Sequence, residues 1–542
     1  MNFIVNETKQ KLRGGYYTPI DLAQFIARWV VTNNCHSVLE PSCGDGIFIN
    51  ALKRENPTWN GTFVGIEFNE DEAIKSQSTL NSTSFKGTVI NNDFFDWYFN
   101  DSNYHFDGVF GNPPFIRYQY LPDFMQKSAS TLFDQLGLKF TKHTNAWVSF
   151  VLASIELLKP GGRMGLIIPA EIFNVLHAQA LRTYIGQQCS RILIFDPEDL
   201  WFDTTLQGVV ILLAEKKIDV SKKTEGLGVI RTSGRDFLNH HPEEYFHKAS
   251  YLNGHSITGK WTYAFLSSKE LALYTSLEQD SGFVKFNDVA TVDVGIVTGA
   301  NSFFLVDQKT VDEFDLHNLA HPMFGRSDHC PGILYNTKVH TDNISSGLPA
   351  HFLWINTQEL TLKQQEYIKL GESLELQNRY KCRIRKPWYT VPSVYSAPIG
   401  MLKRSHHMPR LLLNEMNAFT TDTAYRVFPK NNNPEDLVFS FVNSITALSA
   451  ELEGRSYGGG VLELVPSEIE RLLLPILRTP IRYEDLTLLD TLVREKDICS
   501  YLPNQDKMVL KTLSGNERTS IFEAWLKLRN RRQRINLTQT QE

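Results

Sequence analysis

Residues 37–46, SVLEPSCGDG, decide the fold class of this chain. A short apolar run, SVLE (37–40), leads into a glycine-rich turn, PSCGDG (41–46), and IFINALKR (47–54) then has the pattern of a helix. Glycines in such a turn let main-chain amides approach a ligand closely, and an acidic residue at a strand end can pair with a cationic or hydroxylated group. The turn lacks the third glycine of the pattern GxGxxG, which argues against NAD.

The same alternation of strands and helices continues after this turn. A helix is expected over 145–158, and the further strand-like runs are FVGIE (63–67), TVINND (88–93), FDGVFGN (106–112), RMGLIIP (163–169), RILIF (191–195) and GVVILLAEK (208–216). Twelve residues separate the last two runs, which is short for a helical crossover, so we expect that pair to be antiparallel. The pattern predicts an α/β fold with a doubly wound, mainly parallel sheet covered on both faces.

Acidic residues end the first three strands and are therefore expected at one edge of the sheet. Glu40, Glu67 and Asp93 hold these positions, and ligands of open α/β sheets bind at the carboxyl ends of the strands. The Glu67 carboxylate can accept hydrogen bonds from both hydroxyls of a ribose. Asp93 can accept from an aromatic amine, and the ring of Phe94 can stack on it.

Asn112-Pro113-Pro114-Phe115 follows the next strand and is expected at the same edge. An exocyclic amine on an aromatic base is a poor nucleophile because its lone pair is delocalised into the ring. Two fixed acceptors, the Asn112 side-chain oxygen and the Pro113 carbonyl, can hold its two hydrogens and favour the tetrahedral form. Two successive prolines restrict the backbone that directs this carbonyl, and Phe115 offers a face for the base.

As a set, these motifs resemble those of N6-adenine DNA methyltransferases, class I enzymes that use S-adenosylmethionine. The NPPF tetrapeptide and the order of the motifs are similar to the gamma arrangement of type II restriction–modification methylases of the Eco57I and TaqI kind, and the resemblance spans residues 13–215. It implies that RGGYYTPIDLAQFI (13–26) is the N-terminal cofactor motif. The residues expected to bind S-adenosylmethionine are Tyr17, Thr18, Pro19, Glu40, Pro41, Ser42, Gly44, Gly46, Glu67, Phe68, Asp93 and Phe94. Those expected to act on the target adenine are Asn112, Pro113, Pro114, Phe115 and Phe202.

Phe202 enters this set through topology. If RILIF runs parallel to its neighbours, the loop DPEDLWFDTTLQ (196–207) lies at the edge that holds Asn112. Two large aromatic residues, Trp201 and Phe202, are costly to expose in a polar loop without a partner. The corresponding loop of the family places an aromatic ring on the flipped base, and Phe202 is the nearer match.

The remaining chain differs in character, and three domains are expected: 1–235 for cofactor and catalysis, 236–480 for target recognition with a mixed α+β fold, and a helical segment, 481–542, with a basic tail. The segments 294–306 and 455–475 resemble parts of the family's target recognition domains. From Leu376 to Leu413 there is no acidic residue, and basic residues are interleaved with aromatic ones. Such a mixture suits phosphates and bases. The residues expected to bind DNA are Arg379, Lys381, Arg383, Arg385, Lys386, Lys403 and Arg404.

The composition of the chain argues against several other classes of protein. The 542 residues carry a formal charge of −5, so a surface for nucleic acid must be a local patch. Six cysteines without a CxxC pair argue against a disulfide framework or a zinc ribbon and favour a reducing cytoplasm. We expect no metal site, because His406 and His407 have no partner at ligand spacing, and no membrane segment or signal peptide.

The sequence thus predicts site-specific methylation of adenine N6 in double-stranded DNA, with a cognate restriction endonuclease as a further candidate partner. Two alternatives remain open. One is an NPPF-type enzyme that methylates RNA or a protein glutamine, although more than 300 residues follow the catalytic motifs, which favours recognition of a DNA site. The other is a catalytically inactive, DNA-binding specificity protein, against which the intact Asn112, Asp93 and Glu67 argue.

Overall fold

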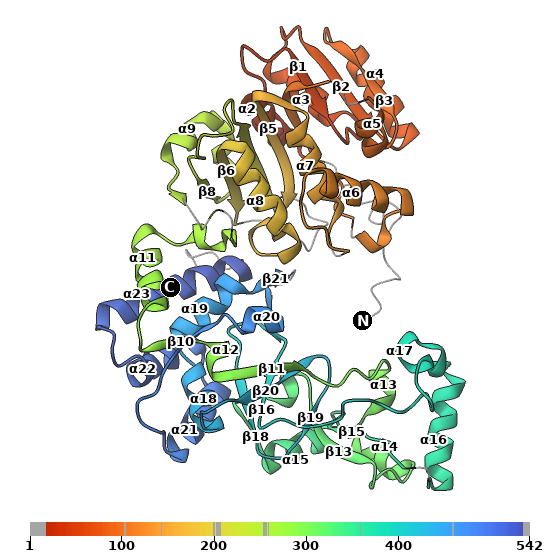
Figure 1. The fold of residues 1–542 in the computed structure, drawn as a ribbon, viewed down its shortest axis with the longest axis vertical. Helices are drawn as coiled ribbons and strands as arrows, with labels where there is room; N and C mark the ends of the chain where they lie inside the picture. Colours follow the sequence, from red (N-terminus) through yellow and green to blue (C-terminus); the bar gives the residue numbers. More distant parts are fainter. Residues whose placement is uncertain are drawn as a thin grey trace. The chain divides into compact units, whose positions relative to one another are not determined.

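The chain folds into two compact units, which are described separately. The computed structural model describes residues 18–101, 104–116, 118–142, 144–198, 201, 208–252, 257, 259–357, 359–457 and 460–534 (Figure 1). The first unit ends at Phe265 and the second begins at Leu266. This division falls after residue 235 because β8 and β9, which follow the methyltransferase motifs, still belong to the sheet of the first unit.

The first unit is built on one nine-stranded sheet with the strand order β3-β2-β1-β4-β5-β7-β6-β8-β9. Its strands are β1 (Ser37–Glu40), β2 (Thr62–Glu67), β3 (Lys86–Asn91), β4 (Phe106–Gly111), β5 (Leu158–Pro169), β6 (Cys189–Pro197), β7 (Val209–Lys216), β8 (Leu227–Thr232) and β9 (Tyr251–Leu252). Strands β1 to β5 pair in parallel, and β7 is antiparallel to both β5 and β6. The expected antiparallel pairing of RILIF with GVVILLAEK is confirmed, and β6 runs in the direction of β5.

Helices between the strands cover both faces of this sheet, as expected for a doubly wound fold. They are α2 (Ile20–Val30), α3 (Ile47–Glu55), α4 (Glu70–Asn81), α5 (Phe94–Asp101), α6 (Asp123–Gln135), α7 (Ala146–Glu156), α8 (Gln179–Gln188) and α9 (Pro242–Lys248). From β1 the chain steps outward to β2 and β3, and from β4 it steps the other way to β5. Because parallel crossovers are right-handed, opposite steps place the connecting helices on opposite faces.

Helix α2 packs closely on the sheet and thereby fixes the residues that precede it. Its buried stripe includes Phe25, Ile26, Trp29 and Val30. Glycines beneath it make the approach possible: a Cβ atom at Gly165 would lie 2.6 Å from the Ile26 side chain, and one at Gly108 would lie 2.4 Å from that of Val30. Thr18 and Pro19 lead directly into this helix, so their position depends on its packing.

Two strand boundaries differ from the prediction. The segment Lys159-Pro-Gly-Gly162 belongs to β5, which begins at Leu158 and not at the predicted residue 163. The apolar run that precedes it ends as α7 at Glu156, so the proline and glycines follow the helix but do not interrupt the strand. Strand β3 ends at Asn91, and Asp93 therefore lies at the start of α5.

The described part of the second unit has a mixed α+β fold with four sheets. The five-stranded sheet has the order β11 (Ala290–Val294), β20 (Ala424–Pro429), β16 (Ile399–Leu402), β18 (Leu411–Asn414), β14 (Leu334–Tyr335). A four-stranded sheet has the order β12 (Leu305–Val306), β15 (His351–Leu353), β13 (Ala320–Phe324), β19 (Phe419–Thr420). A three-stranded sheet has the order β17 (Arg404–Ser405), β22 (Val461–Glu463), β21 (Arg455–Tyr457). In the two-stranded sheet, β10 (Phe283–Lys285) pairs with β23 (Leu473–Pro475). Strand β11 ends at Val294.

Helices complete this unit and include the predicted helical segment at the end of the chain. They are α11 (Ser268–Glu278), α12 (Phe286–Val289), α13 (Asn301–Phe304), α14 (Gln308–Glu313), α15 (Thr337–Ser345), α16 (Leu362–Ser373), α17 (Tyr380–Arg383), α18 (Pro434–Phe441), α19 (Ser444–Glu453), α20 (Pro466–Ile469), α21 (Tyr483–Glu495), α22 (Ile498–Val509) and α23 (Gly515–Gln533). Among the described residues, no helix combines the length and apolar character needed to cross a bilayer.

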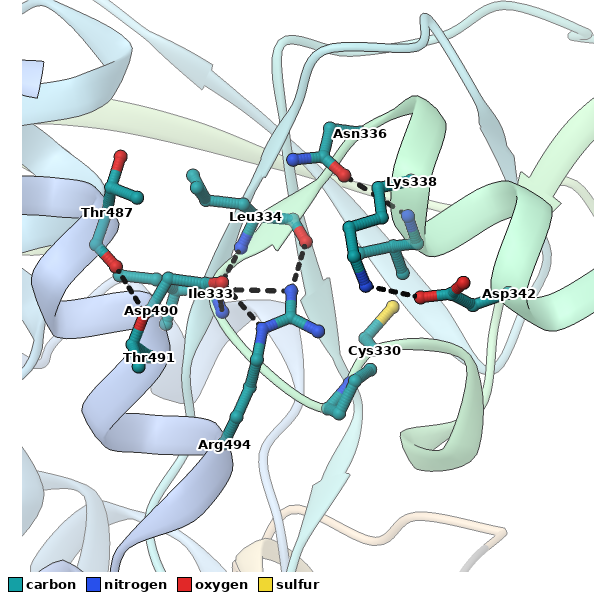
Figure 2. A network of polar contacts seen from close by, with 12 residues as sticks. Cys330, Ile333, Leu334, Asn336, Lys338, Asp342, Thr487, Asp490, Thr491 and Arg494 are labelled. Carbon is teal, nitrogen blue, oxygen red and sulfur yellow. Dashed lines mark hydrogen bonds and ion pairs between the residues drawn. The ribbon is translucent and has the colours of Figure 1, made fainter.

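Buried charged groups join the last helices to the rest of the second unit. Asp490 on α21 accepts hydrogen bonds from the main-chain amides of Ile333 and Leu334 at the edge of β14, at 2.6 and 2.9 Å (Figure 2). Arg494, one turn later, pairs with Asp490 and donates to the Leu334 carbonyl. Helix α21 is thus part of the fold of this unit, because its buried Asp490 carboxylate holds it against the largest sheet.

Candidate active site

The strand order brings the predicted acidic residues and the NPPF segment to one edge of the first sheet. Strand β1 lies between β2 and β4, and all three run in the same direction. Their carboxyl ends carry Glu40, Glu67 and Asn112, and Asp93 follows β3 on the far side of β2. This edge is where ligands of open α/β sheets bind.

The glycine-rich turn after β1 has the conformation that its sequence predicts. Gly44 and Gly46 have φ angles of +50° and +85°, a region that residues with a Cβ atom rarely adopt. The Gly44 amide donates a hydrogen bond to the Glu67 carboxylate at 2.9 Å, which ties the turn to the end of β2. A Cβ atom at Gly44 would meet open space, whereas one at Gly46 would lie 3.1 Å from the Ser76 hydroxyl. The turn is closed toward α4 and open at Gly44.

Glu40 is a buried carboxylate in an unusual position. Its side chain is 1% exposed, and its Oε2 atom has no hydrogen-bond partner among the residues that the structure describes. Burial, with additional repulsion from Asp45 and Glu67, raises the pKa of Glu40 well above its usual range. An ionised carboxylate without a partner is unfavourable in such a place, so the site favours a cationic or hydrogen-bond-donating ligand beside Glu40.

The other two carboxylates are held by main-chain amides. Glu67 accepts from the amide of Asn69, 2.9 Å away, in addition to that of Gly44. Asp93 accepts from the amides of Phe95 and Asp96 at 3.0 Å each, which caps α5. Burial raises the pKa of both groups, and these amides oppose the rise. The orientation of each carboxylate is therefore fixed before any ligand binds.

A cavity of about 310 Å³ lies beside Asp93. Its lining includes two aromatic side chains that are exposed, Phe68 (61%) directly after β2 and Phe124 (47%) on α6. Their ring centroids are 6.5 Å apart. The remaining lining residues are Asn91, Asn92 and Asp96. The cavity thus offers two ring faces and a carboxylate to a flat, amine-bearing ring.

The ring of Phe94 does not line this cavity, which corrects the interpretation of it as a stacking partner. Phe94 is 3% exposed and stacks on Phe150 of α7, with ring centroids 4.9 Å apart. It belongs to the core because α5 begins there and its first side chain packs against α7. Sequence reasoning missed Phe124, whose only signal was an aromatic residue within the largely polar helix α6.

The NPPF segment is connected to both cofactor motifs. The Ser42 hydroxyl donates a hydrogen bond to the main-chain carbonyl of Asn112 at 3.2 Å, and the Asn112 side-chain amide donates to the Thr18 hydroxyl at the same distance. Pro113 is buried, and Phe115 is half-buried against the core. These contacts set the position of Asn112 from two other segments of the chain, the turn after β1 and the residues before α2.

Three predicted residues require separate comment. Tyr17 and Phe202 lie outside the described residues. Pro19 immediately precedes the first residue of α2. The neighbour of Phe202, Trp201, is buried and stacks on Phe237, with ring centroids 5.7 Å apart, so it is a core residue.

The predicted DNA-binding residues all lie in the second unit, and they differ in their surroundings. Lys403 and Arg404 pair with the buried Glu463, at 3.4 and 2.7 Å. The Arg385 guanidinium donates to the main-chain carbonyls of Val297 and Thr298. The members that are exposed and, within the described residues, form no ion pair are Arg379, Lys381, Arg383 and Lys386.

Comparison with known proteins identifies the family. The family described as N-6 DNA Methylase matches residues 3–236, and that described as the C-terminal domain of type II methyltransferase M.Eco57I matches residues 258–510. Along most of its length the chain is therefore similar to type II DNA methyltransferases of restriction–modification systems. The two matches together cover most of the sequence, and the predicted class I methyltransferase fold with its C-terminal α+β domain is confirmed.

Two curated relatives of this methyltransferase match over most of their length. Type II methyltransferase M.AccI of Acinetobacter calcoaceticus is 25% identical and covers 93% of this chain and 91% of its own. M.BanIII of Aneurinibacillus aneurinilyticus is 21% identical, with 80% and 83% covered. Among solved structures, the type IIG restriction endonuclease BpuSI is similar at 15% identity and a TM-score of 0.40, covering 97% of this chain and 67% of its own.

The residues of the sheet edge fit the cofactor that this fold class uses. S-adenosylmethionine carries an ammonium group, a ribose and an adenine. The unpartnered Oε2 atom of Glu40 suits a cation, and the open space at Gly44 leaves room for a ligand against the main chain. The Asp93 carboxylate and the rings of Phe68 and Phe124 suit an adenine.

Proposed function

We propose that this methyltransferase transfers a methyl group from S-adenosylmethionine to N6 of adenine at a specific site in double-stranded DNA. The observation that carries the proposal is the link between Ser42 and Asn112, because it couples the cofactor turn to the only NPPF segment of the sequence. In this proposal Glu40 and Gly44 hold the methionine part, and Glu67 the ribose. Asp93, Phe68 and Phe124 hold the cofactor's adenine.

The target base is proposed to be turned out of the duplex into this edge, since an amine in a base pair is inaccessible to a fixed donor. The cofactor, when bound, supplies a methyl group on a positively charged sulfur. The Asn112 side-chain oxygen and the Pro113 carbonyl accept hydrogen bonds from the two N–H groups of the amine. These bonds favour the tetrahedral amine, whose lone pair is free to attack, and Phe115 packs on the base.

Asn112 contributes to this reaction through its oxygen atom. Its amide NH2 group donates to the Thr18 hydroxyl, which orients the side chain, and its oxygen is the proposed acceptor for the amine. An acceptor that binds the amine more tightly as it becomes tetrahedral lowers the barrier rather than the Michaelis constant. The expected role of the enzyme in the cell is modification within a restriction–modification system, alongside an endonuclease for the same site.

The direct test is to incubate the protein with tritiated S-adenosylmethionine and plasmid DNA, RNA or protein, and to identify the labelled product. We expect label in duplex DNA, recovered as N6-methyladenine after hydrolysis. The Asn112→Ala variant should fold and bind cofactor normally but lose methylation by orders of magnitude. The matched control is Asn81→Ala at the exposed end of α4, which should keep full activity.

The same assay separates the alternatives. Label in RNA or in a protein glutamine would replace the proposed substrate while keeping the site. Binding of DNA without any transfer would identify an inactive specificity protein. Near-normal turnover by Asn112→Ala would contradict the proposed mechanism, because the Pro113 carbonyl alone holds only one of the two N–H groups of the amine.

A further inference from the structure

Two large apolar side chains project into solvent from α17 in the second unit. Tyr380 begins this helix and Ile384 follows its last residue, so they are four positions apart and lie on one helical face. Each is 63% exposed. Val297, on the loop after β11, is 39% exposed and is held beside α17. We define the α17 surface as residues 379–386 together with Val297.

This surface is fixed to the domain core. Arg385 donates to the carbonyls of Thr298 and Val297 at 2.6 and 2.7 Å. Cys382 is fully buried beneath the helix. Gly299, with φ of +83°, allows the loop to approach, since a Cβ atom there would lie 2.7 Å from the Lys381 side chain. The exposed side chains are therefore presented on a rigid support, which lowers the entropic cost of binding.

Positive charge surrounds the two apolar side chains. Arg379, Lys381, Arg383 and Lys386 are exposed, and none of them forms an ion pair with an acidic side chain that the structure describes. The charged groups of Lys381 and Arg383 each lie 5.5 Å from the centre of the Tyr380 ring. In contrast, Glu463 neutralises Lys403 and Arg404. On a chain of net charge −5, the cations of α17 are a local site for a polyanion.

We propose that the α17 surface enters a groove of the DNA and contributes to sequence selection, with Tyr380 and Ile384 against base edges and the flanking cations on phosphates. The inference rests on the proposed function, since it assigns the partner of the same enzyme. Apolar side chains recognise the thymine methyl group and the stacked edges, whereas phosphate contacts position the protein without reading sequence. The charge around the apolar pair favours DNA over an apolar protein partner.

The experiment compares two double variants of the full chain. Sites methylated by the wild-type enzyme are first read by modification-sensitive sequencing of plasmid DNA. Tyr380→Ala with Ile384→Ala should reduce the ratio of methylation at that site to methylation at a site with one altered base pair. We expect a fall of about five- to fiftyfold, with the salt dependence of DNA binding unchanged.

Arg383→Ala with Lys386→Ala should do the opposite. The ratio between sites should stay near the wild-type value, and the log–log slope of affinity against salt should fall by about 0.9 for each phosphate that is no longer bound. Leu362→Ala, which truncates an exposed apolar residue at the start of α16, is the matched control. It should change neither the ratio between sites nor the salt slope. Melting temperatures of all variants establish that they fold.

The outcomes separate the inference from the proposed function. If the wild-type enzyme labels no DNA, the proposed function fails. If it labels DNA but the apolar double variant keeps the wild-type ratio between sites, the α17 surface does not read bases and the inference is overturned. An unchanged slope in the basic variant as well would mean that this surface faces a protein partner instead. Should the apolar double variant fail to fold, Ile384→Ala alone, with the same expected direction, replaces it.

Discussion

The side-chain amide of Asn112 donates a hydrogen bond to the hydroxyl of Thr18, 3.2 Å away, across 94 positions of sequence. Thr18 is buried and precedes α2, whose apolar face is packed on the sheet. The rotation of the Asn112 amide therefore depends on a residue from the N-terminal motif. A fixed amide presents its oxygen in one direction, and that direction is what an acceptor for an amine requires.

Replacing Thr18 by valine removes the hydroxyl but keeps the shape of the side chain. We expect a roughly fivefold fall in kcat, because a hydrogen bond that orients a reacting group is worth about 1 kcal/mol. KM for S-adenosylmethionine should change little, since Thr18 acts here through Asn112. Steady-state methylation of plasmid DNA measures both constants, and Thr18→Ser should restore kcat.

Thr519→Val, at an exposed position of α23, is the control for loss of a threonine hydroxyl. It should leave kcat and melting temperature at wild-type values. A Thr18→Val enzyme with normal kcat and a lowered melting temperature would show that the hydrogen bond serves packing alone.

Cofactor binding should change the protonation state of the buried Glu40 carboxylate. Its pKa is raised in the ligand-free protein by burial and by Asp45 and Glu67. A cationic group placed beside Glu40 stabilises the ionised form and lowers this pKa, so cofactor binding should release protons. Titration calorimetry in buffers of different ionisation enthalpy measures the release. The release should decrease as pH rises through the raised pKa of the free carboxyl, because Glu40 is then already ionised before the cofactor binds.

Glu40→Gln should abolish this proton release and weaken cofactor binding by at least tenfold, since the amide cannot form a charge-assisted hydrogen bond with the cation. Glu55→Gln, a partly exposed glutamate at the end of α3 that pairs with Arg28, is the matched control. Proton release that persists in Glu40→Gln would assign the titration to another group.

The sequence predicted the sheet and its ligand edge because both follow from local patterns. Strand ends such as Glu40 and Glu67 can be read from apolar runs, and parallel strands bring their carboxyl ends together. The direction of the Phe94 side chain could not be read in this way. Asp93 caps α5, and the first turn of that helix directs Phe94 toward Phe150, a residue more than fifty positions away. Phe124 was missed for the same reason.

The basic segment, residues 376–413, likewise could not be interpreted fully from local sequence patterns. Composition identified residues 376–413 as a candidate DNA surface, but it could not separate cations that face solvent from those that support the fold. Arg385 holds the loop after β11, and Glu463 neutralises Arg404, a partner 59 positions away. Pairings over such distances depend on tertiary structure and are not encoded in local charge patterns. The nature of the second unit as an α+β domain was nevertheless predicted correctly.

Truncating the aromatic residues near Asp93 should lower either cofactor affinity or stability, depending on the residue. Phe68→Ala and Phe124→Ala should each weaken cofactor binding by about 5- to 100-fold, because stacking on an adenine is worth roughly 1–3 kcal/mol. Both side chains are largely exposed, so the melting temperature should change little. Equilibrium binding of S-adenosylmethionine and thermal denaturation of the same samples measure the two effects.

Phe94→Ala should show the reverse behaviour. Removing a ring buried against Phe150 leaves a cavity and costs about 3–5 kcal/mol of the free energy of unfolding. Phe94→Leu should recover much of this stability, and its cofactor affinity should match that of the wild type. A Phe94→Leu protein that is stable but binds cofactor poorly would return Phe94 to the cofactor site.

The second unit contains a buried acid whose titration should affect its stability. Asp506 on α22 is almost fully buried and accepts hydrogen bonds from the amide and hydroxyl of Ser444, at 2.8 and 2.5 Å, at the start of α19. Burial raises the pKa of Asp506 from 3.8 to about 6, and the two hydrogen bonds from Ser444 oppose the rise. The folded state therefore favours the protonated carboxyl.

The stability that Asp506 contributes is thus fully present below its unfolded pKa of about 4 and is lost as pH rises through about 6. Asp506→Asn keeps an acceptor for the Ser444 amide and cannot ionise. Relative to the wild type, this variant should gain about 2–3 kcal/mol of unfolding free energy between about pH 4 and pH 7. Denaturant titrations at a series of pH values measure the difference, and Asp342→Asn on the exposed face of α15 controls for the removal of a surface charge. A difference that stays constant with pH would mean that Asp506 ionises equally easily in the folded and unfolded chain, and that its hydrogen bonds with Ser444 fully offset the cost of burial.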